Sequence, residues 1–145
     1  AMVGGMVNKQ SYENIQALKD YGQALGILFQ LQDDVLDYKA TPHTWGKDKG
    51  DDFREGKVTL PVILAYEKAD ECQKDFWHRV FVDQHQEPRD LEIAISHMHT
   101  HGVFHAIDAI MHHYSHKAQN ALKNYKGLYH QALLALSSYC LDRKF

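Results

Sequence analysis

One uninterrupted helical pattern, between residues 12 and 38, constrains the fold of this chain more than any other feature. Its apolar residues recur at spacings of three and four, the period of one helix face, and include Ile15, Leu18, Leu25, Leu28, Leu31 and Leu36. Ser11 is a suitable N-cap residue immediately before the pattern. Gly22 and Gly26 lie inside it, which indicates either close approach of another helix, the interpretation we favour, or space left for a ligand such as an isoprenoid tail. The sequence therefore predicts one long helix that ends near Tyr38.

Shorter helical patterns fill most of the remaining chain. Residues 1–7 read as the end of a helix that Gly4 and Gly5 stop, and residues 39–58 read as a loop. The further helices predicted by apolar spacing cover 59–69, 71–82, 88–101, 103–124 and 128–142. No alternating run of β-branched residues lies between hairpin turns, so we expect no strand. With 145 residues, 44% of them hydrophobic, the chain is long enough for one all-α domain with its own core.

Composition and charge argue against several classes of protein. A net charge of −3 without a basic run disfavours nucleic-acid binding. No stretch approaches roughly 18 consecutive apolar residues, so we expect no membrane span, and the first residues lack the pattern of a signal peptide. Cys72 and Cys140 match neither a zinc spacing nor a disulfide framework. We therefore expect packing cysteines in a cytoplasmic protein.

The end of the long helix carries an unusual group of carboxylates. Asp33 and Asp37 stand four residues apart and project from one helix face, and Gln30 lies three residues before Asp33 on that face. Such a like-charge pair destabilises a helix by about 0.2–0.5 kcal/mol, and the adjacent Asp34 adds to the repulsion. A cation opposite this face would relieve it. Oxygen ligands on a rigid helix suit Mg²⁺ that is shared with substrate phosphates.

A charged segment follows the acidic face. Eight of the eleven residues from Lys47 to Lys57 are charged, and Gly46, Gly50 and Gly56 allow the backbone to approach a ligand closely. Lysine suits diphosphate oxygens as a point charge. Alone, this segment is typical of a solvated loop. Together with the acidic helix, it predicts half of a magnesium-diphosphate site.

Four other kinds of site are disfavoured. The segment from Gly50 to Thr59 is not a P-loop, because one residue too many separates its glycines and Val58 interrupts the lysine–threonine pair. Its glycine and glutamate offsets do not fit an EF-hand either. The chain contains 11 histidines, but those in 97–116 have no cysteine or carboxylate at zinc spacing, so we expect them to be solvated or to face a partner. No serine or cysteine lies in a nucleophile elbow.

The acidic helix and the charged segment together resemble the second aspartate-rich region of the trans-polyprenyl diphosphate synthases. The matching segments, in order, are Phe29–Asp37, Gly46–Lys47, Gly50–Lys57 and Thr59–Pro61. The segment Gly50–Lys57 resembles the long-chain, octaprenyl- or decaprenyl-type enzymes that make quinone side chains. The resemblance implies the C-terminal part of the isoprenoid synthase helical bundle, usually a homodimer. It also implies Mg²⁺ bound between two acidic motifs and an allylic diphosphate.

The resemblance gives the acidic helix its roles. Asp33 would ligate Mg²⁺, with Asp34 and Asp37 supporting it directly or through water. Gln30 would lie beside the reacting allylic carbon, and Phe29 would help to line the cavity. The allylic carbon would then react with isopentenyl diphosphate, and the product would grow by one five-carbon unit.

The charged segment would handle the leaving group. Lys47 and Lys57 would hold and neutralise the departing diphosphate, because preorganised positive charge stabilises the negative charge that develops there. Asp52 would orient the segment through hydrogen bonds to a lysine or to metal-bound water.

The family's first aspartate-rich motif and its isopentenyl diphosphate pocket belong to an N-terminal half that these residues do not contain. We therefore expect residues 1–145 to be the C-terminal half of a polyprenyl synthase domain, to need the missing half as a partner, and to be inactive alone. One alternative is a non-catalytic helical subunit or interaction module of the same fold. Another is a different class I terpenoid enzyme, which fits less well because cyclases usually carry an Asn/Ser/Glu motif in place of these aspartates.

Overall fold

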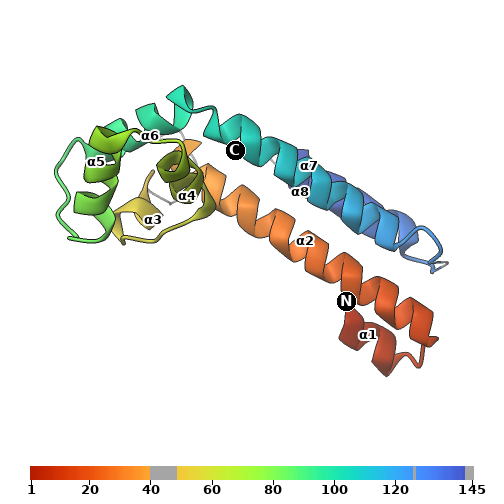
Figure 1. Cartoon of the computed structure of the whole chain (residues 1–145). Coiled ribbons are helices and arrows are strands. Elements are labelled where there is room, and N and C mark those ends of the chain that lie inside the picture. Colours follow the sequence, from red (N-terminus) through yellow and green to blue (C-terminus); the bar gives the residue numbers. More distant parts are fainter. Residues whose placement is uncertain (40–48, 126, 143–145) are drawn as a thin grey trace. The chain divides into compact units, whose positions relative to one another are not determined.

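The computed structural model describes residues 1–39, 49–125 and 127–142, so Lys47 and Gly46 lie outside the described residues. Regular structure in these ranges is helical and includes no strand, as predicted (Figure 1). The helices are α1 (Met2–Val7), α2 (Tyr12–Lys39), α3 (Asp51–Arg54), α4 (Leu60–Glu67), α5 (Glu71–Phe81), α6 (Asp90–Thr100), α7 (Val103–Ala121) and α8 (His130–Asp142). Within the same ranges, no helix has the length and apolar character needed to cross a membrane.

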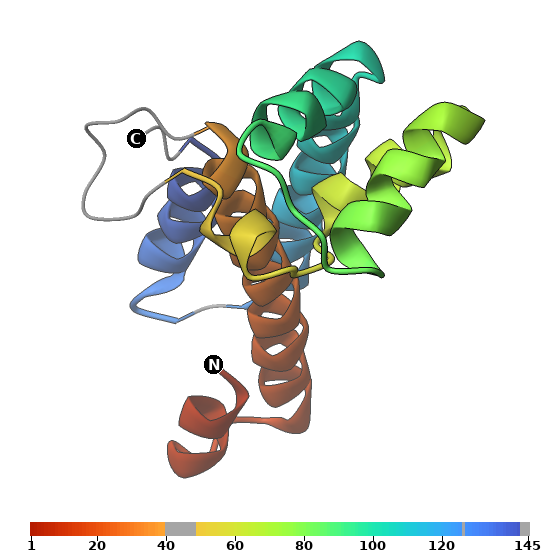
Figure 2. The same ribbon diagram turned by 90° about the vertical axis from the view of Figure 1, so that its left-hand side faces the viewer.

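The start of the chain corrects one expectation and confirms another. Helix α1 runs through Gly4 and Gly5, so these glycines do not stop a helix. It folds back beside the first turns of α2 (Figure 2), and a Cβ at Gly5 would lie 2.9 Å from Leu18 Cδ1. The glycine is thus explained by close packing rather than by helix termination. Helix α2 begins as predicted, because the Ser11 hydroxyl accepts a hydrogen bond from the Asn14 backbone N–H at 3.3 Å.

One compact unit comprises residues 1–32 and the described part of 109–144. Its core lies where α7 and α8 pack along the first part of α2 (Figures 1 and 2), and contains Leu18, Tyr21, Ala24, Ala118 and Leu122. The Tyr21 hydroxyl donates to the Leu133 carbonyl at 2.8 Å, which ties α2 to α8. At Gly26 the expected close packing is wrong for the described chain, since a Cβ there would meet nothing within 4 Å. A Cβ at Gly22, by contrast, would lie 3.3 Å from Ala1 Cβ, so this glycine does have a close neighbour.

The other compact unit is Asp33–Asp108. Helix α5 begins with a capping box. The Asp70 carboxylate accepts the Gln73 backbone N–H, and the Gln73 side-chain oxygen accepts the Asp70 backbone N–H. Helix α6 begins at Asp90 rather than at the predicted residue 88, because the Asp90 carboxylate binds the Glu87 N–H at 2.7 Å and closes a turn there. Cys72 is exposed, so only Cys140, in the first unit, is a buried packing residue.

Candidate functional site

The predicted site residues on α2 differ in burial. Asp34 and Asp37 are buried, at 7% and 5% exposure, although they are charged side chains that rarely occupy such positions without partners. Asp33 is half-buried, and Phe29 and Gln30, one turn earlier on the same helix, are exposed. Of the three aspartates, Asp33 is therefore the most exposed and Asp37 the most buried.

Asp37 joins the end of α2 to the start of α3. Its Oδ1 accepts the Asp51 N–H at 3.1 Å and its Oδ2 accepts the Asp52 N–H at 3.2 Å. Its main-chain oxygen accepts the Gly50 N–H at 2.9 Å. Burial raises the pKa of the Asp37 carboxyl, and the nearby charge of Asp52 raises it further, against the opposing effect of the two amide donors.

Helix α3 corrects the prediction that residues 39–58 are entirely loop. It spans only four residues, and Gly50 at its N-cap adopts the left-handed conformation with φ of 84°. A Cβ at position 50 would also overlap the side chain of Leu91. Glycine is therefore required there for two independent reasons, backbone conformation and space.

Lys57 follows α3 and is bound to its acidic residues. Its Nζ donates to Asp52 Oδ1 at 2.9 Å and lies 2.6 Å from Glu55 Oε2, while half of the side chain remains exposed. Hydrogen bonds to these two carboxylates, that to Glu55 first, raise the pKa of the Lys57 ammonium. Lys57 is therefore a charged lysine held in place near the acidic turn of α2.

Helix α5 and the loop that follows it also contact α3. The Gln86 side-chain amide donates to the Phe53 carbonyl at 2.9 Å. The Phe53 ring meets the Phe81 ring edge-on, with centroids 5.5 Å apart. Sequence reasoning missed these contacts, because neither Gln86 nor Phe81 belongs to a motif.

The structure thus brings together Asp37, Asp52 and Lys57 of the predicted site residues, and Lys47 lies outside the described residues. Among the described residues, no group of three or more histidines, cysteines or carboxylates is arranged to hold a metal ion. The roles predicted for Asp33, Asp34, Asp37, Gln30 and Phe29 stay predictions.

The histidines of residues 97–116 do not all match the expectation that they are solvated. Helix α6 ends at Thr100 and α7 begins at Val103, so His101 and His105 do not share a helix, as predicted. His97 is not a solvated histidine, because its ring packs against Phe76 and Trp77 at 5.2 and 5.9 Å. Burial lowers the pKa of His97, and the neighbouring His101 lowers it further.

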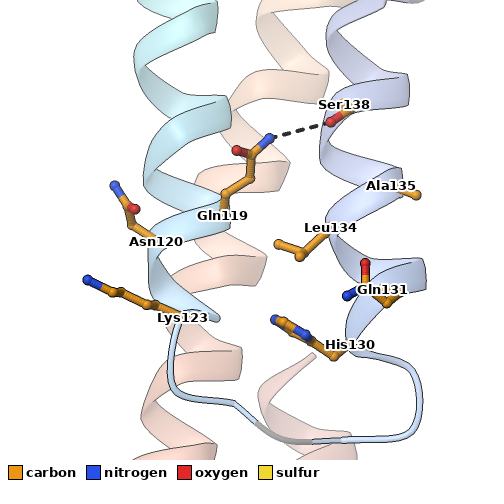
Figure 3. A pocket seen from close by; sticks show the side chains of 8 residues that line it. All are labelled: Gln119, Asn120, Lys123, His130, Gln131, Leu134, Ala135 and Ser138. Atoms are coloured by element: carbon orange, nitrogen blue, oxygen red, sulfur yellow. Dashed lines mark hydrogen bonds between the residues drawn. The ribbon is translucent and has the colours of Figure 1, made fainter.

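A separate pocket lies between the end of α7 and the start of α8, in the first compact unit (Figure 3). The residues that line it are Gln119, Asn120, Lys123, His130, Gln131, Leu134, Ala135 and Ser138. The Gln119 amide donates across it to the Ser138 hydroxyl at 3.4 Å. None of the predicted site residues lines this pocket.

Comparisons with known proteins agree on one family. The polyprenyl synthetase family matches residues 1–98. The octaprenyl diphosphate synthase of Haemophilus influenzae is 34% identical over 149 positions, which cover 100% of this chain and 43% of that protein. A decaprenyl diphosphate synthase structure from Rhodobacter capsulatus has a TM-score of 0.85 and 39% identity, covering 98% of this chain and 43% of that one.

A polyprenyl synthase from Caulobacter crescentus, solved with calcium and isoprenyl diphosphate, has a TM-score of 0.90 and 34% identity. The match covers 99% of this chain and 44% of that one. This chain therefore spans less than half the length of these relatives.

Proposed function

The chain belongs to the polyprenyl synthetase family and has its helical fold, and on this premise we propose that it forms the C-terminal half of a trans-prenyltransferase. The proposed reaction condenses an allylic diphosphate head-to-tail with isopentenyl diphosphate and yields a polyprenyl diphosphate. The observation that carries the proposal is the acidic turn of α2 joined, through Asp37, to the segment with Asp52 and Lys57. Likeness to octaprenyl and decaprenyl synthases supports a long-chain product.

Mg²⁺ fits the donors of the acidic turn. Carboxylate oxygens are hard ligands, and magnesium is usually held by one or two of them together with waters and substrate phosphates. We assign Asp33 as the ligand because it is the least buried of the three aspartates, with Asp34 in support. When bound, the ion would supply positive charge that stabilises a departing diphosphate.

The remaining residues would bind and orient the substrate. Lys57 is fixed by Asp52 and Glu55 yet keeps its side chain 56% exposed, so its ammonium is available to diphosphate oxygens. We propose the same role for Lys47. Gln30 would lie beside the allylic carbon and Phe29 would line the cavity for the apolar chain, both from the turn before Asp33.

The proposal extends to partners and location. We propose that an N-terminal half with the first aspartate-rich motif completes the site, and that the complete protein is a homodimer in the cytoplasm. The chain alone would be inactive, because one aspartate-rich motif cannot hold the whole metal-diphosphate complex.

A fusion protein tests this function. The chain is joined to the N-terminal part of the Haemophilus influenzae octaprenyl diphosphate synthase. Incorporation of radiolabelled isopentenyl diphosphate is then measured with farnesyl diphosphate and Mg²⁺. We expect the fusion to be active and the chain alone to be inactive. Asp33→Ala in the fusion should reduce turnover roughly 100- to 1,000-fold, as expected for loss of one preorganised electrostatic group.

Asp75→Ala is the matched control, because Asp75 is an exposed carboxylate on α5 outside the proposed site. Turnover by the chain alone would refute the half-site. Full activity of the Asp33→Ala fusion would refute the assignment of Asp33. A fusion that folds with native helicity but does not turn over would refute the prenyltransferase proposal and favour a non-catalytic subunit.

A further inference from the structure

Asp37 receives three successive backbone N–H groups. Those of Gly50, Asp51 and Asp52 bind its main-chain oxygen, its Oδ1 and its Oδ2, respectively, at 2.9, 3.1 and 3.2 Å. A helix start leaves its first N–H groups without intrahelical partners, and Asp37 supplies acceptors for two of those in α3. Because the residue is only 5% exposed, water cannot easily replace these bonds.

Further contacts hold α3 in place at its other residues. Gln86 binds the Phe53 carbonyl, and Phe81 packs on the Phe53 ring. Helix α3 is therefore held by α2 through Asp37 and by the α5–α6 region through Phe53. A four-residue helix has little stability of its own, so these contacts determine where it lies.

Asp52 transmits that position to Lys57. Its Oδ1 accepts from the Lys57 ammonium at 2.9 Å, and its main-chain oxygen accepts the Lys57 N–H at 2.9 Å. Asp37 binds the N–H of the same Asp52. Loss of the Asp37 carboxylate would therefore release both the start of α3 and the lysine attached to it.

We propose that Asp37 is a positioning residue, whose carboxylate fixes α3 and, through Asp52, sets where Lys57 meets a diphosphate. The inference rests on the proposed function. It also gives the aspartates of the acidic turn two different roles, positioning of α3 and ligation of the metal. Both Asp37 oxygens already accept a backbone amide donor, which favours Asp33, with Asp34 in support, for metal ligation.

Amide hydrogen exchange on the chain itself tests the first step. Asp37→Asn keeps the shape of the side chain but replaces one acceptor by an NH₂ group that faces an amide donor. We expect exchange at the amides of Asp51 and Asp52 to accelerate at least about tenfold, which corresponds to loss of one buried hydrogen bond. Asp33→Asn, one turn earlier, should leave both rates within about twofold. Unchanged exchange at these amides in Asp37→Asn would overturn the proposal.

Kinetics of the fusion protein test the second step. Asp37→Asn and Lys57→Met should each raise KM for the allylic diphosphate, and the double variant should be no worse than Lys57→Met, because both changes act through one lysine. Asp37→Asn should leave the Mg²⁺ requirement unchanged, whereas Asp33→Asn should raise it. Additive effects of the two substitutions on KM, or a raised Mg²⁺ requirement in Asp37→Asn, would instead show that Asp37 is a metal ligand. An inactive fusion would refute the proposed function, while exchange would still decide whether Asp37 holds α3.

Discussion

The ion pair between Arg79 and Asp90 should dominate the stability of the α5–α6 region. Asp90 is 1% exposed, and both of its oxygens accept from the Arg79 guanidinium, at 2.8 and 2.9 Å. Asp90 also accepts the Glu87 N–H, and Arg79 donates to the His85 carbonyl. The pair therefore also holds the segment that connects α5 to α6. Breaking a buried pair destabilises a protein by about 3–5 kcal/mol. Because the Arg79 side chain is 31% exposed, we expect about 3 kcal/mol for Asp90→Ala.

Thermal unfolding followed by circular dichroism measures this effect. For a chain of this size, a loss of 3 kcal/mol corresponds to a fall in Tm of about 6–12 °C. The control is Lys74→Met, which removes an exposed ion pair with Glu71 on the same helix and should leave Tm nearly unchanged. A Tm of Asp90→Ala within about 2 °C of the parent would refute the reasoning.

The pH dependence supplies an independent check on the same pair. Hydrogen bonding from Arg79 lowers the pKa of Asp90 below its ordinary value of 3.8. A carboxyl group with a lowered folded-state pKa stabilises the protein fully above its unfolded-state pKa. That contribution is lost as the pH falls through the folded-state pKa. Asp90→Ala should therefore lose stability less steeply below pH 3.8 than the parent does.

Four further substitutions test other parts of the structure. Gly50→Ala should cost about 1–2 kcal/mol from its left-handed backbone alone, plus the displacement of Leu91. Gly56→Ala, which shares the positive φ but has open space around it, should cost the backbone part only, and equal losses in chemical denaturation would contradict the packing argument. Gly26→Ala should stabilise the chain by about 0.8–1 kcal/mol, because alanine favours the helix and meets no neighbour. His97→Leu should weaken the loss of stability as pH falls below 6.5, since burial lowers the pKa of His97; an unchanged pH profile would exclude that cause.

Most of the helical architecture could be predicted from the sequence, because it depends on local spacing. The period of apolar residues predicted α2, and Gly102 predicted the separation of α6 from α7. The capping box of α5 was not predicted, although Asp70 and Gln73 have the spacing that it requires. Helix α1 was misjudged because Gly5 reflects packing against Leu18, which no local pattern reveals.

The sequence predicts that the acidic turn and the charged segment form one site, but it does not predict the connection between them. Asp37 stands 14 residues from Asp51 and 15 from Asp52, and spacing within one helix does not predict a partner at that distance. The sequence predicts the same supporting role for Asp34 and Asp37 beside Asp33, because the pattern records residue type and helix face only. The structure distinguishes Asp37, which accepts two backbone amide donors, from the half-buried Asp33, which we propose as the ligand. The same residue type can therefore position a binding segment at Asp37 and bind an ion at Asp33, and amide exchange at Asp51 is the measurement that separates the two roles.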